Sequence, residues 1–230
     1  MSEAEWEAIW LSVKIAGSAL GWILVPGIAL AWLLARRDFP GKALLDGILH
    51  LPLVLPPVVV GYLLLISLGR RGALGQWLND WFGITLPFTW QGAAVAAGVM
   101  AFPLLVRAVR LSLEAVDRKL EAAASTLGAG RLRVFFTITL PLCIPGLLTG
   151  SVLAFARALS EFGATITFAS NIPGETRTLP LALYSLLQMP GQEAAAARLS
   201  VISIVIAMAS LLISEWLARI AKRRIQQRDG

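Results

Sequence analysis

The sequence predicts an all-α, polytopic integral membrane protein, and three observations lead to this fold class. Hydrophobic residues make up 57% of the 230 residues, whereas about 45–50% is usual in soluble domains. Uncharged runs long enough to cross a bilayer as helices recur along the chain. The Lys and Arg residues, which produce a net charge of +6, gather between these runs. This distribution is typical of membrane proteins, and it disfavours nucleic-acid binding, which needs one continuous basic face.

Five runs predict transmembrane helices, because about 17–25 apolar residues cross a bilayer. They are Ile15–Ala35, Leu51–Gly69, Trp81–Val106, Val134–Ala156 and Leu199–Ser214. We expect the helix of the third run to begin near Trp90. A sixth run, Thr178–Gln192, has only 15 residues, and we interpret it as a short helix or re-entrant segment outside the core. If it crossed fully, the chain would have six spans.

The distribution of Lys and Arg predicts the orientation, because basic residues concentrate in cytoplasmic loops. With the loop around Glu121 inside, five spans place fourteen Lys and Arg residues inside and four outside. Six spans would put the basic C-terminal cluster outside, so the bias favours five. The acidic N-terminus lacks the basic segment of a removable signal peptide, and we expect the first run to be retained. The basic tail after Ile220 is explained by this topology, or by binding to anionic lipid.

The segment between the third and fourth spans, EAAASTLGAGRLRVFFTITLP from Glu121 to Pro141, carries the most specific pattern. Its Glu-Ala-Ala start is rich in helix formers. Gly128 and Gly130 allow a sharp reversal, and Pro141 would fit the first turn of the next helix. A short helix held between two spans would act as a lever, and its small side chains would allow close packing in a groove of a partner.

This segment resembles the EAA loop of the membrane subunits of bacterial ATP-binding-cassette importers. Within that family the chain most resembles the molybdate permeases and less closely the sulfate permeases, over Phe39–Leu65, Leu127–Pro141 and Ala154–Pro180. The resemblance implies one transmembrane domain over residues 1–230, with a cytoplasmic coupling loop at about 112–137. The coupling residues that it implies are Glu121, Ala122, Ala123, Ser125, Leu127, Gly128, Ala129, Arg131 and Pro141.

The resemblance also implies partners and a place in the cell. We expect a homodimer in the bacterial inner membrane, with a periplasmic N-terminus and a cytoplasmic C-terminus, two cytoplasmic ATPase subunits and a periplasmic oxyanion-binding protein. The sequence contains no GxxxxGK[ST] loop, which is the phosphate-binding loop of many ATPases. We therefore expect ATP and Mg²⁺ to be used by the partner ATPase and no cofactor to be bound by this chain.

Polar residues near the end of the fourth run are candidates for the translocation path. Arg157 and Glu161 are four residues apart and can pair on one helical face. With Ser160 and Thr165 they could line a path or gate for an oxyanion, and sulfate or tungstate remain alternatives to molybdate. Equally, Arg157 and Glu161 could simply anchor the end of the span.

Two further alternatives are a secondary transporter and a membrane-bound enzyme, and no metal-ligand cluster or nucleophile–base constellation supports the enzyme. A secondary transporter driven by an ion gradient would usually need a carboxylate in the middle of a span, and the sequence offers none there. For the single histidine, His50, we expect a pair with Asp46 and not a metal site, which needs more ligands. We interpret the single cysteine, Cys143, as a small buried residue, and most tryptophans as membrane-interface anchors.

Overall fold

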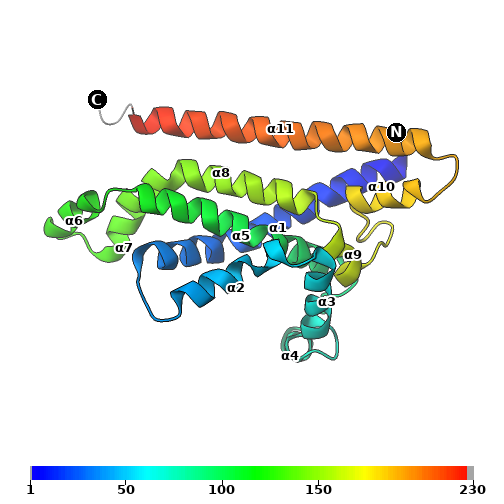
Figure 1. Ribbon diagram of the computed structural model, residues 1–230, viewed down its shortest axis with the longest axis horizontal. Coiled ribbons are helices and arrows are strands. Elements are labelled where there is room, and N and C mark those ends of the chain that lie inside the picture. The colour runs from blue at the N-terminus through cyan, green and yellow to red at the C-terminus, as the bar shows by residue number, and fades with distance from the viewer. Residues whose placement is uncertain (1, 227–230) are drawn as a thin grey trace.

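The computed structural model describes residues 2–226, and every regular element in that range is helical. Four helices are long and apolar enough to cross a membrane: α1 (Glu3–Arg36), α5 (Trp90–Ala115), the continuous helix Arg131–Leu159, and α11 (Glu193–Gln226). Figure 1 shows these long helices lying side by side, with α6 (Arg118–Thr126) at one end of the molecule and α10 (Leu179–Leu187) at the other. These two ends of the molecule are the α6 end and the α10 end.

The core lies where α1, α5 and the continuous helix meet, and it is built largely from small side chains. Ala93, Ala97 and Ala101 of α5 are fully buried, as are Ala16 and Ala19 of α1. Small residues allow membrane helices to approach closely, because packing and not the hydrophobic effect holds such helices together. The alanine-rich face of α5 therefore makes α5 the central helix of the bundle.

The first span is longer than the sequence indicated, because α1 begins at Glu3 and not near Ile15. Ser2 forms a capping box with Glu5: Ser2 Oγ accepts from the Glu5 N–H, and the Ser2 N–H donates to Glu5 Oε2. Such reciprocal caps satisfy backbone donors that a helix start leaves free. Glu5 also pairs with Arg198 at 2.9 Å, so this acidic segment joins α1 to α11.

The second predicted span is not a single helix, which corrects the interpretation of Leu51–Gly69. The chain forms α2 (Lys42–Val54) and α3 (Pro57–Leu68), which are bent by 114° relative to each other. Pro56 and Pro57 explain the break, because proline lacks an N–H donor and disfavours helical geometry in the residue before it. Counting this bent pair as one broken span gives five spans in the described residues.

Helix α3 is held by close packing on α9 (Gly163–Ala169). A Cβ atom at Gly61 would lie 2.7 Å from the Ala164 carbonyl oxygen, and one at Gly163 would lie 2.8 Å from Pro57 Cβ. Both helices therefore need glycine where they touch. Beyond α3, the short helix α4 (Ala73–Phe82), which we did not predict from the sequence, projects from the bundle (Figure 1).

The remaining predictions for the spans are confirmed. Helix α5 begins at Trp90 as expected, and the run Thr178–Gln192 contains only the short helix α10. Cys143 is buried. Lys14 Nζ lies 3.7 Å from the centre of the Trp90 ring, so the ammonium group makes a cation–π contact with the indole. The side chains of the basic tail after Ile220 lie outside the described part of the structure.

Candidate functional site

Helix α6 forms within the predicted coupling loop, as the Glu-Ala-Ala segment indicated. It begins after Asp117, whose Oδ1 accepts a hydrogen bond from the Lys119 N–H at 2.9 Å. It ends in a Schellman motif, in which the Gly128 N–H donates to the Ser125 carbonyl and the Ala129 N–H donates to the Ala124 carbonyl. This motif requires a left-handed residue, and Gly128 provides it with φ of +85°.

The two glycines of the loop have different roles. Gly128 adopts the left-handed conformation that favours glycine, and it creates the reversal. Gly130 precedes α7 (Arg131–Val134) with φ of −67° and ψ of 159°, a conformation open to any residue. The interpretation that both glycines are needed for the reversal is therefore wrong for Gly130.

Glu121 connects α6 to two spans. Its Oε1 accepts a hydrogen bond from Arg36 Nη2 at 2.8 Å and another from Thr139 Oγ1 at 2.6 Å. Arg36 is the last residue of α1, and Thr139 belongs to the continuous helix that follows the loop. Because hydrogen bonds to ionised groups are short and comparatively strong, a displacement of α6 would be transmitted to both spans.

No sequence pattern indicates that Arg36 and Thr139 belong to this site. Arg36 lies 85 residues from Glu121, and in the sequence it is only one basic residue among many. Its side chain is only 8% exposed, which for an arginine indicates a fixed partner. No local sequence pattern predicts the pair of Arg36 with Glu121, because the pair depends on how α1 packs against the loop.

The other face of α6 is exposed in the described part of the chain. None of its residues is buried, and Ala122, Ala123 and Ser125 are exposed. Leu127, directly after α6, is 89% exposed, and Leu120 and Leu132 are also exposed. These three leucines lie on the segment after α5, where we predicted a loop outside the membrane. If these exposed leucines lie outside the membrane as predicted, they are candidates for contact with a partner.

Pro141 lies in the first turn of α8 (Leu140–Leu159), as expected. The chain is already helical before α8, however, because α7 begins at Arg131 and Phe135–Thr139 forms one π-helical stretch, η1. The Leu140 N–H donates to the Phe135 carbonyl across the widened turn. A proline inside an α-helix removes one hydrogen bond and its ring clashes with the carbonyl four residues earlier. The π stretch relieves that clash directly before Pro141.

The candidate path residues lie at the junction between α8 and α9. Arg157 Nη1 is 2.6 Å from Glu161 Oε2, so the predicted pair is present, and the Glu161 side chain is only 1% exposed. Glu161 Oε1 also accepts a hydrogen bond from the Ala164 N–H at 2.8 Å. Thr165 is buried and Ser160 is exposed. This arrangement fixes the junction, while a role in translocation remains a prediction.

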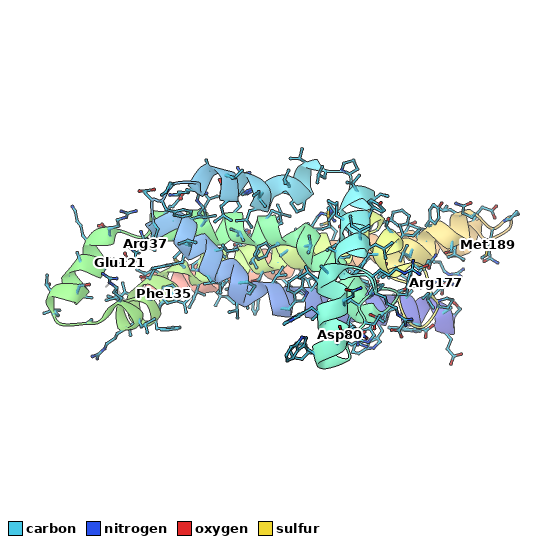
Figure 2. All side chains as sticks on the ribbon, turned by 90° about the horizontal axis from the view of Figure 1, so that it is seen from below. Arg37, Asp80, Glu121, Phe135, Arg177 and Met189 are labelled. Carbon is cyan, nitrogen blue, oxygen red and sulfur yellow. The ribbon has the colours of Figure 1, made fainter. Side chains whose placement is uncertain are left out.

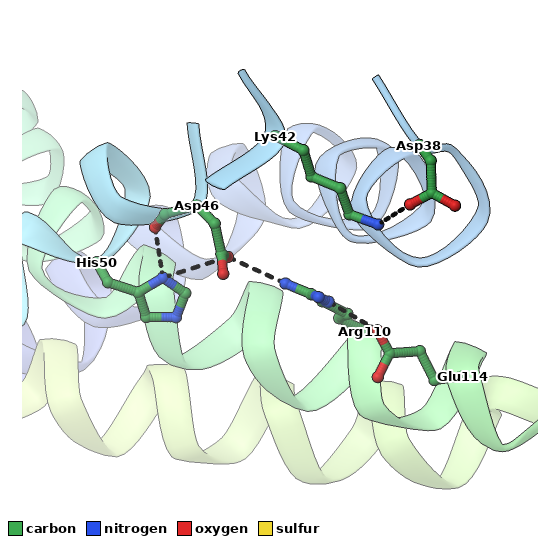
Figure 3. Close-up of polar contacts among 6 residues, drawn as sticks. All are labelled: Asp38, Lys42, Asp46, His50, Arg110 and Glu114. Carbon is green, nitrogen blue, oxygen red and sulfur yellow. Dashed lines mark hydrogen bonds and ion pairs between the residues drawn. The ribbon is translucent and has the colours of Figure 1, made fainter. Parts of the chain in front are cut away.

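A second polar cluster joins α2 to α5, as Figure 3 shows. Asp46 Oδ1 lies 3.1 Å from Arg110 Nη1, and Arg110 Nε pairs with Glu114 at 2.8 Å. His50 Nδ1 lies 2.7 Å from the Asp46 carbonyl, so the expected contact of His50 with Asp46 is confirmed. Nearby, Lys42 donates a hydrogen bond to Asp38, and this bond holds the pKa of the Asp38 carboxyl below its ordinary value.

Comparison with known proteins identifies the family and the fold. The family profile described as "Binding-protein-dependent transport system inner membrane component" matches residues 27–227. Among solved structures, a methionine ABC transporter captured in inward-facing conformations aligns with a TM-score of 0.73 and 16% identity, over 96% of this chain and 99% of that one. A bacterial alginate ABC transporter aligns with a TM-score of 0.76 and 19% identity, over 96% and 81% of the two chains.

Curated relatives are similar over almost the whole chain. The molybdenum transport system permease protein ModB of Escherichia coli is 67% identical over 97% of this chain and 98% of its own. ModB of Haemophilus influenzae is 57% identical over 97% of each chain. The sulfate transport system permease protein CysT of Escherichia coli is 41% identical, over 81% of this chain and 66% of its own. The chain belongs to the family of inner-membrane components of binding-protein-dependent transport systems.

Proposed function

We propose that this chain is the transmembrane permease subunit of an ATP-driven importer that carries molybdate across the bacterial inner membrane. The molybdenum permeases match it at 67% and 57% identity over nearly its full length. The sulfate permease is less similar and matches over a smaller part of the chain. These differences favour molybdate over sulfate as the transported ion.

The observation that supports this function best is the surface of α6. A helix with no buried residue, followed by a leucine that is 89% exposed, is held beyond the spans by hydrogen bonds that its one acidic residue, Glu121, accepts from Arg36 and Thr139. An isolated helix of nine residues is unstable in water, so this one is maintained for contact with a partner. We assign that surface to a cytoplasmic ATPase subunit, with α6 lying in a groove of the ATPase.

Alternating access follows from how α6 is connected. Two copies of this chain would each hold one ATPase, and ATP binding would bring the two ATPases together. That movement displaces α6, and Glu121 transmits it to α1 through Arg36 and to the continuous helix through Thr139. The spans then alternate between inward-open and outward-open arrangements. ATP and Mg²⁺ belong to the ATPase.

The orientation and the external partner complete the proposal. The α6 end faces the cytoplasm and the α10 end faces the periplasm, which places the N-terminus outside and the C-terminus inside. A periplasmic binding protein would deliver the anion to the α10 end, and the solved alginate transporter is itself in complex with a periplasmic protein. Arg157, Ser160 and Thr165, near that end, are then candidates for contact with the passing anion.

Uptake of labelled molybdate tests this function in cells that lack their own molybdate and sulfate importers. The cells express the chain together with the ATPase and the binding protein of a molybdenum transport system. We expect uptake that excess tungstate blocks and excess sulfate barely changes. Uptake that sulfate blocks would reassign the substrate to sulfate. Uptake that persists when the ATPase is omitted would contradict the importer mechanism.

A further inference from the structure

A cavity of about 340 Å³ lies at the α6 end, between the end of α1, helix α6 and the start of the continuous helix. Figure 2 shows three of its lining residues, Arg37, Glu121 and Phe135, gathered at that end of the molecule. Four arginines line the cavity: Arg36, Arg37, Arg118 and Arg131. They come from three different segments of the chain, so the fold and not a local sequence cluster brings them together.

The charges around this cavity are not balanced. Among the described residues, Glu121 is the only carboxylate that lines the cavity, and it is already paired with Arg36. Arg118 Nη2 donates to the Ala35 carbonyl at 3.4 Å, and Arg37 lies near the Trp32 ring. Within the described residues, Arg37 and Arg131 have no ion-pair partner. Four guanidinium groups that line one cavity with a single carboxylate leave an excess of positive charge, which matches the charge and the acceptors of an oxyanion.

One buried donor indicates that an acceptor is missing. Arg36 Nε is buried and has no hydrogen-bond partner among the described residues, although Nη2 of the same group is bound to Glu121. A buried donor without a partner costs about 1–3 kcal/mol. An oxygen of a bound anion in this cavity would be within the reach of the guanidinium groups that line it.

The position and the apolar wall of the cavity indicate which oxyanion occupies it. The uncharged run of α1 ends at Ala35, so Arg36 and Arg37 lie at the level where a span meets the lipid headgroups. Trp32, Val134 and Phe135 form an apolar side of the same cavity. A site with arginines on one side and aromatic rings on the other matches a phosphate attached to an acyl chain.

We propose that this cavity binds the phosphate of an anionic phospholipid headgroup. The excess of arginines favours a headgroup with a net negative charge over phosphatidylcholine, whose choline cation would be repelled. Glu121 and Ser125 of α6 line the same cavity, so the bound lipid touches the helix that we assign to the ATPase. The proposal concerns binding to this chain alone, and it can be tested whether or not the proposed transport function holds.

Native mass spectrometry of the full chain, purified in detergent, measures this binding directly. The chain is titrated with phosphatidylglycerol, with phosphatidylcholine of the same acyl chains, and with inorganic phosphate. We expect phosphatidylglycerol to be retained preferentially. Arg37→Gln and Arg131→Gln should each weaken its retention about tenfold, as expected for the loss of one charged hydrogen bond. Neither variant removes an ion pair of the described chain, so both should keep the wild-type melting temperature.

Arg133→Gln is the matched control, because Arg133 is exposed in the same short helix as Arg131 and does not line the cavity. It removes the same charge and should leave phosphatidylglycerol binding unchanged. Equal retention of both lipids, or an equal loss in all three variants, would overturn the proposal. Inorganic phosphate that competes as well as phosphatidylglycerol would also overturn the lipid assignment and indicate a soluble anion.

Discussion

The α10 end and the α6 end of this molecule are held together in different ways. At the α10 end, polar contacts link segments distant in sequence: Glu5 pairs with Arg198, the Leu179 N–H donates to Ser12 Oγ at 2.6 Å, and Glu175 accepts from the Trp90 N–H. At the α6 end, by contrast, an exposed helix is joined to the spans mainly through the Glu121 carboxylate, with one long hydrogen bond from Arg118 to the Ala35 carbonyl beside it. The α10 end is therefore held by several polar contacts within the chain, whereas α6 has few such contacts and an exposed face.

This difference indicates that a partner would move the protein at the α6 end. A segment held by many internal contacts moves as one body with its neighbours. A helix held through few residues moves the spans mainly through those residues, which in α6 are Glu121 and Arg118. Substitutions at the α10 end should thus act on stability, while those on the free face of α6 should act on partner binding.

Gly61→Ala should have the largest effect on stability and would break the α3 to α9 contact. The new Cβ would lie 2.7 Å from the Ala164 carbonyl oxygen, and overpacking of this kind costs about 3 kcal/mol at its upper range. Unfolding in detergent micelles by titration with SDS measures the loss. The matched control is Gly47→Ala in α2, where a Cβ meets open space and should stabilise by roughly 0.5–1 kcal/mol. Equal effects at the two positions would refute close packing as the reason for Gly61.

Glu121→Ala should have the next largest effect, because it leaves the buried Arg36 without its partner. The Glu121 side chain is itself 22% exposed, so we expect a loss of about 2 kcal/mol, as for a hydrogen bond to a charged group. Glu114→Ala provides the comparison, since the pair of Glu114 with Arg110 is more exposed and should contribute at most about 1 kcal/mol. A smaller loss for Glu121→Ala than for Glu114→Ala would show that Glu121 does not fix α6 to α1.

Gly128→Ala should cost about 1 kcal/mol, because only Gly128 of the two loop glycines has a positive φ. The cost should appear locally, as faster amide hydrogen exchange in the last turn of α6. Gly130→Ala is the control two residues away, and it should leave exchange in α6 unchanged. If both variants accelerated exchange equally, the Schellman motif would not be what ends α6.

Much of this architecture was predictable from the sequence, because hydrophobic run length and helix formers act locally. The start of α5 at Trp90, the short helix α10 and the helix around Glu121 all followed from such patterns. The break at Pro56 and Pro57 was visible as a proline pair, yet hydropathy alone reads Leu51–Gly69 as one span. Hydropathy measures only how strongly side chains avoid water, whereas the bend arises because proline lacks a backbone N–H donor.

The candidate site was predictable only in part. Glu121, Leu127 and Gly128 belong to one local motif and could be selected from it. Arg36 and Thr139, which hold Glu121, could not, because their contact depends on how α1 packs against the loop. The same holds for the arginine-lined cavity, whose members come from three segments. Contacts between segments that are distant in sequence produce no periodic pattern, so they cannot be predicted from a single sequence.

The central claim is that α6 is the binding site for the partner ATPase, and Leu127→Ser tests it most directly. Leu127 is 89% exposed, so the change should alter the stability of the isolated chain by less than about 0.5 kcal/mol. We predict that the variant inserts into the membrane and melts like the wild type but no longer retains the ATPase during purification. Leu53→Ser, at an exposed position of α2, should retain it. If Leu127→Ser kept the ATPase as well as the wild type does, the assignment of α6 as the binding site would be contradicted.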